Sequence, residues 1–183
     1  IERCLELSNL EAEKIVLNSI AKSHAVLSQE DKDSGVCLID IGAGVTSYSV
    51  FNEGGIVRSG VVALGGDDIT QEIAYAFDTS FEEAKRLKEG YGIAKSSTLK
   101  KDKLIHFSQN KEEHFLSSLE LSEVIERVYC EIFTLLNNEF KYHNIDGIIK
   151  SGFVLCGGGA QIKSILELVR DFFSKRVKIG QIQ

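Results

Sequence analysis

Two glycine-rich segments, each preceded by a short apolar run, constrain the fold of this 183-residue chain more than any other feature. The first is Asp-Ile-Gly-Ala-Gly at residues 40–44, after the run at 36–39; the second is Cys-Gly-Gly-Gly-Ala at residues 156–160, after the run at 153–155. Apolar runs this short and this rich in branched residues indicate buried strands. Glycines let the backbone turn sharply and bring its N–H groups close to a ligand. Two such segments predict the two sides of one binding site.

A returning strand follows the first glycine segment. Tyr48 and Phe51 favour this strand, and Asn-Glu-Gly-Gly at residues 52–55 predicts a turn into a third strand at residues 56–64. Strand, carboxylate, glycine turn and returning strand make a β-hairpin suited to grip a phosphate, with Asp40 placed to hold a metal ion or its waters. Glycine-rich hairpins also occur as plain turns, so this stretch alone leaves both interpretations open.

The second glycine segment predicts a helix that opens near Gln161 and ends at residue 173. Unpaired N–H groups at a helix N-terminus favour anionic or nucleotide ligands. The remaining elements follow from periodicity and capping residues. We expect helices at 2–9, 19–27, 68–77, 80–90 and about 122–138, strands at 13–17, 104–107 and 176–179, and solvated loops at 29–34 and 95–98. Asp67 or Asp68 is the expected N-cap of the third of these helices, and Asp-Thr-Ser at residues 78–80 is expected to cap the fourth.

Four segments together resemble the actin/Hsp70/hexokinase ATPase superfamily: residues 40–44, 62–77, 79–92 and 153–162. Within it, Gly-Gly-Asp-Asp-Ile-Thr at 65–70 and Leu-Lys-Glu-Gly-Tyr-Gly at 87–92 are most similar to the FtsA family of bacterial actin-like cell-division proteins. The resemblance covers nearly the whole chain. The family's first phosphate loop has no counterpart in these residues. It implies an α/β fold, namely an actin-like ATPase (ribonuclease H-like) mixed sheet with flanking helices and an inserted α+β lobe.

The resemblance also implies a domain division and a site. Residues 1–67 and 148–183 would form subdomain 2A, and residues 68–147 the inserted subdomain 2B. The implied ligands are ATP and Mg2+, with the metal held by Asp40 through water. The implied nucleotide-binding residues are Asp40, Gly42, Ala43, Gly44, Val45, Gly65, Gly66, Asp67, Glu82, Lys85, Gly157, Gly158, Gly159 and Gln161. Glu82 and Lys85 are equally well explained as a surface ion pair on one helix face.

Two positions depart from the superfamily pattern. That pattern would place Thr at position 45 and Asp at position 47, where this chain has Val45 and Ser47. Valine has no hydroxyl to contact a terminal phosphate, and serine lacks the charge for metal-assisted activation of water. We therefore assign no catalytic residue and expect nucleotide binding with weak or no hydrolysis.

By resemblance, the function is that of an ATP-binding scaffold that tethers FtsZ to the cytoplasmic face of the cell membrane at the division septum and self-associates into filaments. The membrane anchor of such proteins is a C-terminal amphipathic helix, which we expect to be absent because this chain stops at Gln183. A chaperone-like or sugar-kinase-like ATPase and an actin-like pilus-assembly protein are the alternatives. The formal net charge of −6 argues against nucleic acid as the main partner.

The resemblance places the partner surface on the inserted lobe, which would receive the acidic and apolar C-terminal tail of FtsZ. Lys101, Lys103 and Arg127 are the basic candidates, with Lys100 beside them and Leu104 as an apolar neighbour. An ordinary solvated loop explains the lysines equally well.

Overall fold

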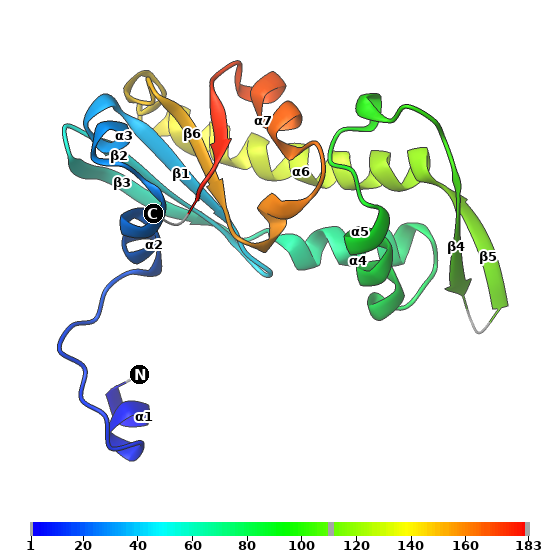
Figure 1. The fold of residues 1–183 in the computed structure, drawn as a ribbon, viewed down its shortest axis with the longest axis horizontal. Coiled ribbons are helices and arrows are strands. Elements are labelled where there is room, and N and C mark those ends of the chain that lie inside the picture. Colours follow the sequence, from blue (N-terminus) through cyan, green and yellow to red (C-terminus); the bar gives the residue numbers. More distant parts are fainter. Residues whose placement is uncertain (1, 110–111, 182–183) are drawn as a thin grey trace.

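The computed structural model describes residues 2–109 and 112–181. Its centre is a five-stranded mixed sheet with the order β3-β2-β1-β6-β7 (Figure 1). The strands are β1 (Val36–Ile41), β2 (Thr46–Asn52), β3 (Gly55–Val62), β6 (Gly152–Cys156) and β7 (Val177–Ile179). β1 runs antiparallel to β2 but parallel to β6, and β3 and β7 form the edges. All six residues of β1 are buried, which confirms the central position predicted from its apolar run.

Helices surround the sheet and extend beyond one end of it (Figure 1). They are α1 (Glu2–Leu7), α2 (Asn18–Val26), α3 (Gln29–Ser34), α4 (Gly66–Ala76), α5 (Phe81–Tyr91), α6 (Ser118–Tyr142) and α7 (Ile165–Phe173), with short 3-10 helices at Ser96–Thr98, Asp146–Ile148 and Gly158–Gln161. None of the residues of α1 is buried, and α1 lies apart from the body of the fold. Within the described ranges, no helix combines the length and the apolar character needed to cross a membrane.

A second region lies beside the sheet and consists of α4, α5, the first part of α6 and an antiparallel hairpin (Figure 1). The hairpin joins β4 (Leu104–Gln109) to β5 (Glu112–Ser117), which confirms the strand expected at 104–107 and pairs it with β5. Helix α6 connects the two regions, because near its end Phe140 packs on Tyr48 and Phe153 of the sheet. The division of the chain into subdomains at residues 68 and 147 stays a proposal. The last turns of α6 lie before residue 147 but pack against the sheet.

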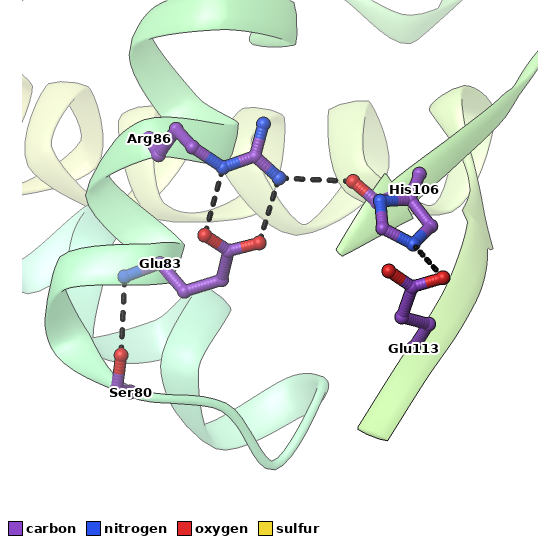
Figure 2. Close-up of polar contacts among 5 residues, drawn as sticks. All are labelled: Ser80, Glu83, Arg86, His106 and Glu113. Atoms are coloured by element: carbon purple, nitrogen blue, oxygen red, sulfur yellow. Dashed lines mark hydrogen bonds and ion pairs between the residues drawn. The ribbon is translucent and has the colours of Figure 1, made fainter. Parts of the chain in front are cut away.

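Polar contacts fix the hairpin to α5 (Figure 2). Arg86 donates two hydrogen bonds to the Glu83 carboxylate, at 2.7 and 2.6 Å, and a third to the backbone carbonyl of His106 on β4 at 2.9 Å. His106 also lies 3.2 Å from the Glu113 carboxylate across the hairpin. Ser80 accepts from the Glu83 N–H at 3.2 Å, so it is the capping residue within the predicted segment 78–80. The hairpin is therefore anchored through the guanidinium of Arg86.

Two sequence predictions near the N-terminus are wrong. Residues 13–17 are not a strand: their apolar side chains are exposed, and in the described structure they are not paired with the sheet. Residues 29–34 are a helix, not a solvated loop, because Ser28 and Asp31 form a reciprocal capping box. Burial raises the pKa of Asp31, but its hydrogen bonds from Lys178 on β7 and from Ser28 outweigh this effect and lower the pKa below its usual value.

Three predicted helix starts also shift. Helix α6 begins at Ser118, earlier than expected, because Ser117 and Glu120 form a capping box. Helix α4 begins at Gly66, and its N-cap is Gly65, whose N–H donates to the Asp68 carboxylate at 2.6 Å. The second glycine segment opens a four-residue 3-10 helix, and α7 starts only at Ile165. The expected α-helix N-terminus at Gln161 is therefore wrong.

Candidate functional site

The first glycine segment is the turn between β1 and β2, and it docks on the start of α4. The N–H of Gly66 donates to the carbonyl of Gly42 at 2.8 Å, and the N–H of Asp67 donates to the carbonyl of Ala43 at 2.7 Å. A Cβ at Gly65 would lie 2.4 Å from the Ala43 oxygen, so a side chain cannot be accommodated there. The N-terminus of α4 therefore holds the backbone of this turn in place. This contact was not predicted from the sequence.

The second glycine segment leaves β6 beside β1. Gly157 has a φ of 88°, and a Cβ there would lie 2.4 Å from the Ile41 carbonyl oxygen, so this position requires glycine. Tyr129 on α6 donates its hydroxyl to the carbonyl of Gly159 at 2.7 Å. Burial raises the pKa of the Tyr129 hydroxyl, so it stays protonated at neutral pH and serves as a donor. The first glycine segment is thus held by α4 and the second by α6.

A cavity of about 490 Å³ lies between these two turns. Eight residues that the sequence assigned to the nucleotide line it: Gly42, Ala43, Gly66, Asp67, Lys85, Gly158, Gly159 and Gln161. Six others do not: Asp40, Gly44, Val45, Gly65, Gly157 and Glu82. Gly65 and Gly157 lie behind the lining and allow the close backbone approaches described above. Glu82 is exposed on α5, where it precedes Lys85 by one turn.

Several lining residues were not predicted from the sequence. They are Lys88, Glu89, Gly92, Tyr129, Ile162 and Lys163. Lys88 on α5 donates to the Gly66 carbonyl at 2.6 Å and to the Thr70 hydroxyl at 2.5 Å, so it joins α5 to the first turn of α4. Burial lowers the pKa of the Lys88 ammonium. Two signals in the sequence pointed to Lys88. It follows Lys85 by three residues on an amphipathic helix, so both share a face, and it lies in the 87–92 segment that resembles the FtsA family.

The charges around the cavity favour an anionic ligand. Three lysines line it, Lys85, Lys88 and Lys163, against the two carboxylates Asp67 and Glu89. The glycine turns add backbone without side chains, so a ligand reaches close to the peptide groups. A phosphorylated ligand with an apolar part suits this combination, because Ile162 and the ring of Tyr129 supply apolar surface in the same cavity.

Asp40 has a partner that the sequence did not reveal. Its Oδ2 accepts from the ammonium of Lys22 on α2 at 2.5 Å, and its Oδ1 is buried with no hydrogen-bond partner among the described residues. Ser47, directly opposite on β2, supplies no second carboxylate. Burial, together with the charge on Asp40, raises the pKa of the Cys156 thiol to about 12, so this neighbour stays protonated. No group of three or more His, Cys, Asp or Glu within residues 2–109 and 112–181 could hold a metal ion.

This arrangement does not fit a magnesium ion held by Asp40, directly or through water. One carboxylate oxygen is occupied by an ammonium group, and the other is inaccessible to solvent. Magnesium requires six oxygen ligands in near-octahedral geometry. As arranged here, Asp40 offers it none.

The basic residues assigned to the partner surface do not form one cluster. Lys101 and Lys103 are exposed in the segment before β4, and the Lys103 N–H donates to Ser118 at the start of α6. Arg127 lies nine residues further along α6, roughly 14 Å by the rise of an α-helix, and pairs with Glu72 on α4 at 3.0 Å. The lysines and the arginine therefore occupy separate parts of the second region.

Solved structures define the class of this fold. MreB5 of Spiroplasma citri bound to ADP matches with a TM-score of 0.83 at 21% identity, covering 98% of this chain and 58% of that chain. The ethanolamine utilization protein EutJ from Carboxydothermus hydrogenoformans matches with a TM-score of 0.69 at 18% identity, covering 97% of this chain and 54% of that chain. Identities this low establish the fold alone. The chain is an α/β protein with the actin-like fold, as the resemblance implied.

The family within this class follows from the sequence comparison. The profile described as Cell division protein FtsA matches residues 37–183, and the chain belongs to the FtsA family. FtsA of Pseudomonas aeruginosa is 33% identical over 182 residues, and FtsA of Bacillus subtilis is 33% identical over 181 residues. These alignments cover 98% and 97% of this chain. The chain spans 44% and 41% of the length of those two relatives.

Proposed function

We propose that this chain is the ATP-binding lobe of an actin-like cell-division protein that recruits FtsZ to the cytoplasmic face of the membrane at the division septum. The observation that carries the nucleotide assignment is the cavity between the two glycine turns, which three lysines line. Membership of the FtsA family carries the role in division.

Two structural neighbours support parts of this proposal. MreB5 of Spiroplasma citri was crystallised with ADP and also with AMPPNP, which supports a nucleotide in the equivalent fold. A double helical filament of MamK matches with a TM-score of 0.64 at 16% identity, which supports self-association of an actin-like chain. We propose that the full-length protein assembles into filaments and that this lobe contributes one of their contacts.

The full-length protein is expected to bind ATP but release phosphate slowly. Val45 is an exposed turn residue without a hydroxyl, and Ser47 stands opposite Asp40 without a charge. Changing Val45→Thr and Ser47→Asp together should raise phosphate release by roughly 10-fold or more, because positioned polar groups that activate water contribute at least that much. Phosphate release is measured colorimetrically on the parent and the double variant. Rapid turnover by the parent protein would contradict the roles given to these two residues.

The FtsZ tail is expected to bind the second region of this fold with micromolar affinity and strong salt dependence. A short acidic peptide that orders on binding gains only part of its contact energy, and its charged contacts are screened by salt. Charge reversal at Lys101 and Lys103 together should weaken binding by roughly 10-fold, since each reversal removes the attraction between an exposed lysine and the acidic peptide. Fluorescence anisotropy with a labelled tail peptide and full-length protein gives the affinity.

The control for the partner surface uses the ion pair of Arg127. Arg127→Glu alone leaves two carboxylates facing each other, whereas Arg127→Glu with Glu72→Arg restores the pair with reversed charges. If Arg127 contacts the tail, both variants weaken binding; if it only joins α6 to α4, the double variant binds normally. Tail binding that ignores the reversal of both lysines would reject this surface, and Lys150→Glu serves as an exposed lysine elsewhere on the chain.

A further inference from the structure

The ion pair between Lys22 and Asp40 is the feature from which a further property of the site follows. Asp40 is the single carboxylate of β1 and is buried, and the two glycine turns begin beside it. Gly42 follows it by two residues, and a Cβ at Gly157 would lie 2.6 Å from its Oδ1. Each of the two turns lines the cavity, the first from two residues after Asp40 and the second from one residue after Gly157. The charge state of this pair therefore acts directly beneath the backbone that would face a phosphate.

Lys22 comes from a different element than either turn. It lies on α2, in the segment before β1, and its side chain is 36% exposed whereas that of Asp40 is 8% exposed. The ammonium covers the outer oxygen of Asp40 at 2.5 Å. A divalent cation, or a water molecule bound to that cation, could reach the carboxylate only after displacing the ammonium of Lys22. Displacement would leave a half-buried lysine without its counter-ion.

We propose that Lys22 takes the place of a divalent cation at Asp40, so that this chain binds a nucleoside triphosphate with nearly equal affinity with and without magnesium. This inference rests on the proposed nucleotide function and adds the cation requirement of that same site. The ammonium of Lys22 offsets the charge of Asp40, which removes the repulsion that an unpaired carboxylate would exert on the phosphates. Lys85, Lys88 and Lys163 supply the remaining positive charge around the cavity.

The test measures binding, not turnover. ATP is titrated into full-length protein by isothermal calorimetry, once in excess magnesium chloride and once in excess EDTA. For the parent protein the two dissociation constants should agree within about threefold, because Asp40 is already neutralised and the free metal has no open carboxylate to join. The exposed lysine variant Lys150→Ala should behave like the parent, since it lies outside the site.

Two variants isolate the role of the pair. Lys22→Ala leaves Asp40 charged and unpaired, so its affinity in EDTA should fall roughly 10-fold or more below that in magnesium. Lys22→Ala with Asp40→Asn removes both charges and should restore equal affinity in the two buffers. The double variant thus separates the charge of Lys22 from any effect of losing its side chain. Circular dichroism confirms that each variant keeps the fold.

The possible outcomes separate this inference from the function on which it rests. A parent protein that binds ATP in magnesium but at least about tenfold more weakly in EDTA overturns the cation inference and leaves the nucleotide function intact. Equal magnesium dependence in the parent and Lys22→Ala overturns it as well. Failure of the folded parent to bind ATP in either buffer overturns the nucleotide function and the inference with it.

Discussion

A Gly158→Val variant is expected to fold like the parent protein and to bind ATP far more weakly. Gly158 lines the cavity, and a Cβ built on it meets nothing within 4 Å, so the protein itself tolerates a side chain there. The valine would occupy space that the ligand needs. Overpacking of this kind costs about 2–3 kcal/mol, which corresponds to a loss of affinity on the order of 100-fold. Calorimetric titration of ATP into the full-length variant measures it.

Gly147→Val is the matched control for this result. Gly147 also has open space around its Cβ position but lies in the 3-10 helix Asp146–Ile148, outside the cavity lining. We expect it to bind ATP normally. Gly157 is unsuitable, because its positive φ and its contact with the Ile41 carbonyl would make substitution destabilise the fold itself. Unchanged ATP affinity in a folded Gly158→Val protein would show that the cavity is not the nucleotide site.

A Phe140→Ala variant is expected to lose about 3–5 kcal/mol of unfolding free energy, the usual cost of removing a fully buried phenylalanine. Phe140 is completely buried at the end of α6, with its ring centroid 5.3 Å from that of Tyr48 and 6.0 Å from that of Phe153. Phe173 of α7 completes the cluster at 6.1 Å. Truncation would leave a cavity where α6, α7 and the sheet meet. A domain of this size should then unfold roughly 10 °C lower.

Leu135→Ala is the control on the same helix. Leu135 is 39% exposed, so its truncation removes little buried surface and should cost well under half as much. Thermal unfolding followed by circular dichroism suits both variants, because the chain contains no tryptophan for fluorescence. If Phe140→Ala and Leu135→Ala lower the melting temperature equally, α6 does not attach the second region to the sheet through this cluster.

The central strands and both glycine turns could be predicted from the sequence, since each depends on a local pattern. The run at residues 36–39 is apolar throughout, and a strand buried on both faces requires such a run. The cap at Ser80 was predictable for the same reason, because its partner is the N–H of Glu83 three residues on. Half-exposed α5, with its polar outer face, followed from helical periodicity.

Two other local predictions failed. Residues 13–17 have strand-forming side chains, but they pair with no strand of the described sheet, and their apolar side chains stay exposed. The polar segment at 29–34 is helical because the reciprocal cap between Ser28 and Asp31 and the contact with Lys178 stabilise it. The pattern of apolar residues carried no sign of the helix at 29–34, since that helix depends on hydrogen bonds of polar side chains.

The sequence by itself determined the family, the strands on either side of the two glycine turns, and eight of the residues that line the cavity. The tertiary structure alone decided what surrounds them. Lys22 reaches Asp40 from 18 positions away, Lys88 reaches Gly66 from 22, and Tyr129 reaches Gly159 from 30. Periodicity and capping describe neighbours within a few residues along the chain, whereas these contacts form only when α2, α5 and α6 pack against the glycine turns. The partner of Asp40, and with it the expected indifference to magnesium, is therefore a property of the folded chain.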